Sequence, residues 1–243
     1  MKRRMTLNMQ KTDFSVGIIA AMTVEAEGIC SSMTETSEKE VSGIKFVVGR
    51  LHGINAVVAV CGVGKVFAAI CAETMILEFS PDLIINTGVA GTLTDKLSIG
   101  DIAIADKLVQ HDMDTSPLGD PVGMISGINL VYLPTSEKYS ALLLEATKKL
   151  GTKNCLVGTI ASGDKFISDT DEKKRIVSLF DACACEMEGA AIAQVCYVNN
   201  TPCCVMRAIS DGSDENASLD FPTFVKESAE RGSAVIKAFF RLL

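Results

Sequence analysis

The chain alternates between short apolar runs and longer amphipathic segments. Continuous apolar runs are typical of strands buried on both faces, and they occur at residues 16–21, 83–85, 101–105, 156–161, 182–185 and 203–209. Two further runs, 46–49 and 56–60, are joined through His52-Gly53 as in a hairpin. Helical patterns follow at 23–32, 64–79, 140–150, 172–180, 187–198 and 224–243. The alternation predicts an α/β fold, a three-layer αβα sandwich with a mixed, largely parallel central sheet.

The sequence predicts one domain, preceded by a tail and interrupted by one long loop. Residues 1–13 are polar and basic and lack the apolar stretch of a signal peptide, so they predict a disordered tail. No linker, repeat or low-complexity stretch follows, which favours one domain over 14–243. Residues 110–129 hold three Gly, two Pro and three Asp and predict the longest loop, where functional residues often lie.

Composition excludes several classes of partner. The chain of 243 residues has 23 Lys and Arg against 30 Asp and Glu, a net charge of −7, which argues against nucleic acid. The apolar stretch 16–22 is too short to span a membrane. Nine cysteines without a CxxC pair, and an odd number, favour thiols packed in a reducing cytosol. His52 and His111 are the only histidines and neither neighbours a Cys cluster, so we expect no metal and a cytoplasmic protein.

Several catalytic and nucleotide motifs are absent. The sequence contains no GxxxxGK[ST], GxGxxG, GxSxG or HExxH. Gly62-Val63-Gly64-Lys65 resembles part of a phosphate loop but lacks the first Gly at the needed spacing. A tight turn into a helix is the favoured interpretation of this run.

Carboxylates lie where the predicted strands end. Active sites of such folds gather at the carboxyl ends of strands, which here are residues 22–25, 86–91, 186–188 and 210–214. Glu25, Glu188 and Asp211 each come at or just past an apolar run. Partial burial there can raise a carboxyl pKa and make the group a usable acid or base. Any one of them alone could cap a helix or turn, but three in one topological position can converge on one crevice.

Several carboxylates without a metal or a nucleophile suit glycosidic cleavage. One acid protonates the leaving group, a second negative group stabilises the oxocarbenium-like centre, and a third activates water. In N-glycosidic cleavage, protonation of a ring nitrogen lets the base leave as a neutral heterocycle. The spacing alone does not identify the substrate.

These residues carry a resemblance that covers roughly residues 15 to 240. The chain resembles the 5′-methylthioadenosine/S-adenosylhomocysteine nucleosidases of the purine nucleoside phosphorylase-like superfamily. The resemblance is carried by the order and spacing of seven segments: Gly17–Met22 with Glu25, Gly62–Lys65, Asn86–Gly91, Gly100–Ile102, Ser162–Ile167, Glu186–Ala190 and Arg207–Asp211.

The resemblance implies roles for the polar residues. Asp211 would be the general acid that protonates adenine N7. Glu188 would bind the ribose hydroxyls and support the cationic sugar. Glu25 would orient and deprotonate the attacking water, with Arg207 as its partner. No cofactor is implied.

The resemblance also implies a nucleoside pocket. Phe166 would stack on adenine, Ile167 would bind the base through its backbone, and Ser210 would support the Asp211 region. The remaining pocket residues would be Met22, Met187 and Phe221, with Val89, Ala90 and Gly91 in the loop beside the ribose. For the apolar residues, plain core packing is an equal alternative.

Two departures from the family leave the 5′ substituent open. Val89 stands where well-studied members carry Ser, and the 111–128 loop lacks their aromatic-Gly-Tyr sequence. Methylthioadenosine, S-adenosylhomocysteine, 5′-deoxyadenosine and a futalosine-type substrate all remain. The resemblance implies a homodimer in which a neighbouring subunit helps close the 5′ pocket. The apolar segment 62–79 supports this, since it has more hydrophobic surface than one face can bury.

Hydrolysis is favoured over phosphorolysis because residues 16–32 and 83–95 contain no Arg or Lys to hold phosphate. Glu25 would repel the anion further. Two alternatives stay open: a phosphate-dependent nucleoside phosphorylase, and a nucleoside-binding protein without catalysis on the same fold.

Overall fold

The structure, a computed structural model, describes residues 14–152, 154–212 and 217–243. The predicted disordered tail, 1–13, lies outside the described residues. The strands are β1 (Ser15–Ala20), β2 (Thr34–Val41), β3 (Ile44–Leu51), β4 (Ile54–Val60), β5 (Leu83–Thr92), β6 (Ile102–Gln110), β7 (Leu133–Pro134), β8 (Cys155–Ser162), β9 (Ala182–Glu186) and β10 (Cys203–Asp211). The helices are α1 (Thr23–Cys30), α2 (Lys65–Phe79), α3 (Glu137–Lys149), α4 (Thr170–Phe180), α5 (Gly189–Val198) and α6 (Ala217–Phe240), with a 3₁₀ turn at Ser116–Leu118.

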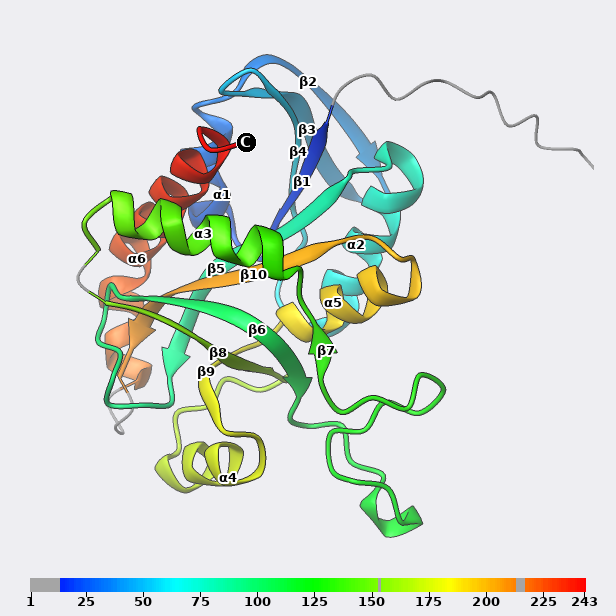
Figure 1. The fold of residues 1–243 in the computed structure, drawn as a ribbon, viewed down its shortest axis with the longest axis vertical. Coiled ribbons are helices and arrows are strands. Elements are labelled where there is room, and N and C mark those ends of the chain that lie inside the picture. Colours follow the sequence, from blue (N-terminus) through cyan, green and yellow to red (C-terminus); the bar gives the residue numbers. More distant parts are fainter. Residues whose placement is uncertain (1–13, 153, 213–216) are drawn as a thin grey trace, which may run out of the picture.

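The strands form one mixed sheet in the order β10-β6-β8-β9-β5-β1-β4-β3-β2 (Figure 1). β1 lies parallel to both β4 and β5, and β5 lies parallel to β10. The predicted α/β class and mixed sheet are therefore confirmed. The sheet also closes, because β10 pairs with both β5 and β6. Closure brings the ends of β5, β9 and β10 to one side, and β1 lies beside β5.

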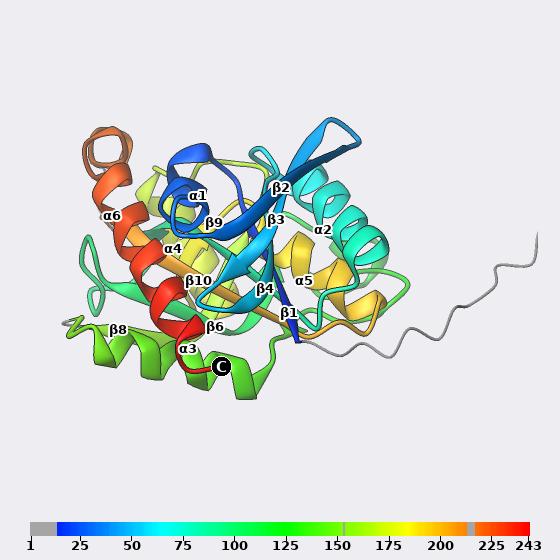
Figure 2. The ribbon, with the colours of Figure 1, turned by 90° about the horizontal axis from the view of Figure 1, so that it is seen from above.

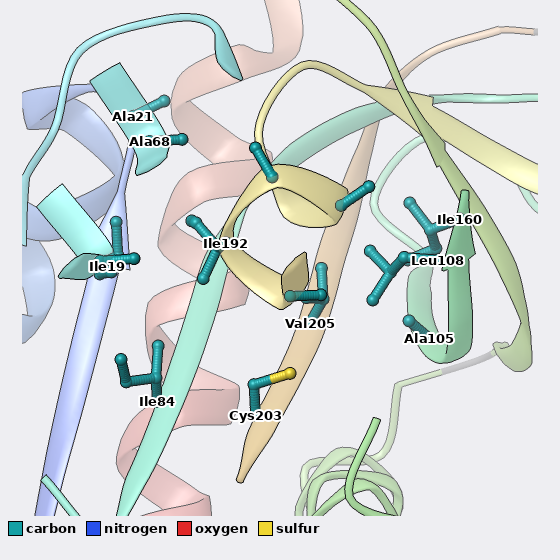
Figure 3. Close-up of a cluster of buried hydrophobic side chains, with 14 of the residues drawn as sticks. Ile19, Ala21, Ala68, Ile84, Ala105, Leu108, Ile160, Ile192, Cys203 and Val205 are labelled. Atoms are coloured by element: carbon teal, nitrogen blue, oxygen red, sulfur yellow. The ribbon is translucent and has the colours of Figure 1, made fainter. Parts of the chain in front are cut away.

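Helices cover both faces of the sheet (Figure 2). α2 and α5 pack on one face, and α1, α3 and α6 pack on the other. In Figure 3 Ile192 of α5 lies among side chains from β1, β5, β10 and β8, including Ile19, Ile84, Val205 and Ile160. α4 packs through Ile176 and Phe180 on a separate apolar cluster.

Several predicted elements differ from the structure. The strand predicted at 83–85 continues to Thr92, and all ten residues of β5 are buried. β2 was not predicted, because its sequence is polar and its strand is exposed at the edge of the sheet. The last helix begins at Ala217 and runs through Pro222, whereas the sequence predicted a start after this proline.

The structure agrees with the predictions of packed, unpaired cysteines and of one long loop. All nine cysteines are free thiols, and seven of them are buried. Residues 111–132 form an irregular segment with only the short 3₁₀ turn and one isolated bridge. Within the described ranges, every helix is too short or too polar to cross a bilayer.

Candidate active site

A cavity of about 340 Å³ lies where β1, β5, β9 and β10 end. It contains the three carboxylates predicted from the sequence. Three larger surface hollows, of about 360, 470 and 590 Å³, contain none of the three, so chemistry rather than volume identifies the site. The lining residues are Ala21, Met22, Glu25, Val63, Val89, Ala90, Gly91, Phe166, Cys185, Glu186, Met187, Glu188, Ser210, Asp211 and Phe221.

Glu25 sits in the first turn of α1, directly after β1. Its Oε2 accepts hydrogen bonds from the N–H groups of Ala21 at 2.9 Å and Met22 at 2.8 Å, and its Oε1 accepts from Val89 N–H at 2.9 Å. Burial raises the pKa of Glu25, and this outweighs the opposing effects of the Arg207 charge and the three N–H groups. A buried carboxylate of raised pKa is suited to accept a proton.

Arg207 pairs with a fourth carboxylate that the sequence analysis did not assign. Its guanidinium bonds Glu186 and the Asn86 side chain, and it is completely buried. The guanidinium of Arg207, the predicted partner of Glu25, therefore bonds Glu186, and it acts on Glu25 through its charge. A buried arginine requires an acidic partner. The sequence offered two candidates for that partner in the Glu186-Met187-Glu188 segment, and this was the signal that could have predicted the pair.

Glu186 is held in the charged form by its neighbours. It accepts hydrogen bonds from the Ser162 hydroxyl and from the N–H groups of Glu188 and Gly189 at the start of α5. Burial alone would raise the pKa of Glu186, but Arg207 and these donors together hold it below its usual range. The start of a helix stabilises an anion in the same way.

Glu188 lies opposite the start of α2. Its Oε1 accepts a hydrogen bond from the Gly64 N–H at 2.7 Å. Burial, followed by the negative charge of Glu186, raises the pKa of Glu188 to about 7. Glu186 and Glu188 are two residues apart, yet their surroundings shift their pKa values in opposite directions.

Asp211 is the last residue of β10, and Ser210 supports it. The Ser210 hydroxyl donates to Asp211 Oδ1 at 2.8 Å. Gly91 of β5 lies directly against the other oxygen: a Cβ atom there would stand 2.5 Å from Asp211 Oδ2. Gly88 has the same relation to Glu25, with a distance of 2.6 Å to Oε1. β5 therefore carries glycine at the two positions where the carboxylate of a catalytic candidate packs against the strand.

The remaining wall of the cavity is apolar. Phe166 is 44% exposed and meets Phe221 edge to face, with ring centroids 5.6 Å apart. Met22, Met187 and Val89 complete the lining. Two predicted substrate-binding residues do not line it: Ile167 is buried in the cluster beside α4, and Arg207 lies behind Glu186. Across the described ranges, no three His, Cys, Asp or Glu side chains are grouped as metal ligands.

Comparison with known proteins places this chain in a family. The model of the phosphorylase superfamily matches residues 15–241. The chain is 36% identical over 229 residues to the 5′-methylthioadenosine/S-adenosylhomocysteine nucleosidase of Shewanella halifaxensis, covering 94% of this chain and 99% of the relative. The chain therefore belongs to the phosphorylase superfamily and, within it, to the family of 5′-methylthioadenosine/S-adenosylhomocysteine nucleosidases.

Solved structures agree with this assignment. A mutant of the Helicobacter pylori nucleosidase with 5′-methylthioadenosine in its active site superposes with a TM-score of 0.91 at 35% identity, covering 95% of this chain and 99% of the other. The futalosine hydrolase of Helicobacter pylori superposes with a TM-score of 0.90 at 36% identity, covering 95% and 98%.

Proposed function

We propose that the protein hydrolyses the N-glycosidic bond of a 5′-substituted adenosine, releasing adenine and the 5′-substituted ribose. Support comes from the family membership and from the cavity itself. The cavity combines aromatic and methionine side chains for a flat base with four carboxylates for glycosidic chemistry. The reaction as proposed uses only side chains and water.

Three of the four carboxylates would take separate roles in this reaction. Asp211, whose Oδ1 accepts the Ser210 hydroxyl, would donate a proton to N7 of adenine. As the bond from C1′ to N9 breaks, the ionised Glu188 would bind the ribose hydroxyls and support the positive charge at C1′. Glu25 would take a proton from the water whose oxygen adds to C1′.

The observation that carries hydrolysis rather than phosphorolysis is the environment of Glu25. The backbone N–H groups of Ala21, Met22 and Val89 could hold an anion at the reacting centre, but all three donate to the Glu25 carboxylate. The nearest guanidinium, Arg207, is paired with Glu186. A phosphate dianion would meet a negative charge and find these donors occupied.

The first experiment measures adenine release from methylthioadenosine, S-adenosylhomocysteine and 5′-deoxyadenosine, with and without phosphate. We expect release in phosphate-free buffer with free 5′-substituted ribose as the second product. Strict dependence on phosphate would instead establish a phosphorylase. Binding of the nucleosides without release would establish a binding protein. The ranking of the three substrates, with a futalosine-type nucleoside as the fourth, would settle the 5′ preference left open by Val89.

We further propose that the protein is a cytosolic homodimer. The nine unpaired thiols suit a reducing compartment. The dimer is supported by the apolar surface of α2, where Val66, Phe67 and Leu77 are exposed.

A further inference from the structure

The Gly62–Lys65 turn resembles part of a phosphate loop, but its donors are already occupied. Two consecutive N–H groups at the start of α2 point to carboxylates of this chain: Gly64 N–H donates to Glu188 at 2.7 Å, and Lys65 N–H donates to Asp164 Oδ1 at 2.7 Å. Helix N-termini of this kind commonly bind anions. Here the anions are the carboxylates of Asp164 and Glu188, which are distant from this turn in the sequence. Both residues belong to segments that line the active site.

The Lys65 side chain closes a ring with the same residues. Its ammonium group lies 2.7 Å from Asp112 Oδ1 and donates to Gln110 Oε1 at 3.1 Å. Asp112 Oδ2 accepts from the Asp164 N–H at 2.9 Å. Lys65, Asp112 and Asp164 are therefore each bonded to the other two. The side chains of Lys65 and Asp112 are only 19% and 30% exposed, so water screens their attraction less than at an open surface.

The ring fixes the start of the loop that carries Phe166. Asp164 precedes Phe166 by two residues, and Gly163 lies directly on His111, where a Cβ atom would stand 2.4 Å from the ring Nε2. Also, the His111 N–H donates to Ser162 O at 3.0 Å. Phe166 itself is 44% exposed, so core packing holds its ring only in part. The position of the Phe166 side chain therefore depends on the backbone of the loop. The Lys65–Asp112–Asp164 network holds that backbone directly, because Asp112 accepts a hydrogen bond from the Asp164 N–H.

We propose that Lys65, Asp112 and Asp164 are positioning residues that hold Phe166 over the base-binding part of the cavity. This inference rests on the proposed nucleosidase function and gives the Gly62–Lys65 turn a role in place of phosphate binding. Removal of the Lys65 ammonium group leaves the Gly64 N–H on Glu188, so the ribose side of the site stays intact. The effect therefore falls on recognition of the base.

The kinetic test uses Lys65→Met and Asp112→Asn with methylthioadenosine or whichever nucleoside the wild type hydrolyses best. Weaker stacking affects ground state and transition state alike, so we expect KM to rise about tenfold with kcat within about twofold of wild type. The double variant adds little to either single change, because both break one ring. Lys149→Met, which removes the Lys149–Glu145 pair on α3, is the matched control and leaves KM unchanged. Unchanged KM in folded ring variants would overturn the proposal.

A second test does not depend on activity. The chain contains no Trp, so Phe166→Trp introduces a single fluorophore on the loop. Adding Lys65→Met to this variant is expected to lower the anisotropy of the Trp and shift its emission to longer wavelength, whereas Lys149→Met changes neither. An identical spectrum with and without Lys65 would refute the positioning role. Absence of nucleoside hydrolysis by the wild type would refute the proposed function and leave this second test in force.

Discussion

At the scale of single residues, the buried cation Arg207 lies among several buried acids at the site. Arg207 is bonded to Glu186 and helps to hold the pKa of Glu186 below its usual range. Burial raises the pKa values of Glu25 and Glu188, which share the influence of Arg207 without bonding it. Environments that separate the pKa values of neighbouring carboxyls are how one site supplies different proton-transfer roles. Glu186 is thus the counter-ion of Arg207, and Glu25 and Glu188, whose pKa values are raised, line the same cavity.

Replacement of Asp211 tests the proposed general acid. Asp211→Asn preserves the shape of the side chain and the acceptor for the Ser210 hydroxyl, but it removes the transferable proton. We expect kcat to fall about 10²- to 10⁴-fold, with nucleoside binding retained in calorimetry. Asp181→Asn is the control, because Asp181 lies at the C-terminus of α4 with φ of 49°, a conformation that Asn also adopts readily. A near-normal rate for Asp211→Asn would remove Asp211 from the mechanism.

The raised pKa of Glu188 predicts how the stability of the fold depends on pH. Its pKa of about 7 in the folded protein lies above its ordinary 4.5, so the folded state binds the proton more tightly. Ionisation of Glu188 in the folded protein therefore lowers the free energy of unfolding. This loss of stability is absent below pH 4.5, grows as the pH rises from 4.5 to 7, and is complete above 7. Glu188→Gln lacks this cost, and we expect it to be more stable than wild type by about 1–3 kcal/mol at pH 8.5 and equally stable near pH 4.5. Urea midpoints at the two pH values measure the difference; a gain that is the same at both would contradict the assignment.

At the scale of elements, β5 shows what the sequence could and could not predict. Its apolar start was predicted, but Asn86 and Thr87 interrupt the apolar pattern, so the buried continuation was missed. Asn86 is tolerated there because its amide group donates to Ile19 O and accepts from Arg207. Such bonds join residues distant in sequence, and periodicity along the chain carries no record of them.

The same limit applies to the site. The positions of Glu25, Glu188 and Asp211 at strand ends follow from the rule for parallel strands, and all three line one cavity. The pairing of Arg207 with Glu186 rather than Glu25 depends on which side chains point behind the cavity. Glu186 lies on β9 and Arg207 on β10, and local sequence patterns do not specify how these two strands are brought together.

The glycine at position 91 of β5 gives a prediction at this scale. A Cβ atom in Gly91→Ala would stand 2.5 Å from Asp211 Oδ2, so the carboxyl must move. Small displacements of catalytic groups are costly, and we expect kcat to fall about 10- to 100-fold while the protein still folds. Gly232→Ala in α6 is the control, since its Cβ would meet no atom closer than 3.5 Å and alanine favours a helix. Full activity of Gly91→Ala would show that Asp211 has room to spare or that its position is unimportant.

At the scale of the whole molecule, one face carries more apolar surface than a monomer needs. Val66, Phe67 and Leu77 of α2 are 70%, 56% and 65% exposed, and Val198 at the end of α5 is 59% exposed. α2 and α5 lie together on one side of the sheet, and a groove of about 470 Å³ runs between them. The inner side of α2 is already buried through Ala68, Cys71 and Met75, so its outer side is available to a second subunit.

The predicted homodimer is tested by a charge on this face. Light scattering of the wild type is expected to give twice the chain mass of 25.8 kDa. In Phe67→Glu each subunit places a carboxylate in the buried interface without a partner, so we expect monomers at micromolar concentration. Leu179→Glu is the matched control: Leu179 is 44% exposed on α4, away from this face, and its variant should remain dimeric. If the partner subunit closes the 5′ pocket, as the family resemblance implies, the Phe67→Glu monomer loses activity on 5′-substituted nucleosides. A wild type that scatters as a monomer would contradict the dimer, and the exposed face of α2 would then require another explanation.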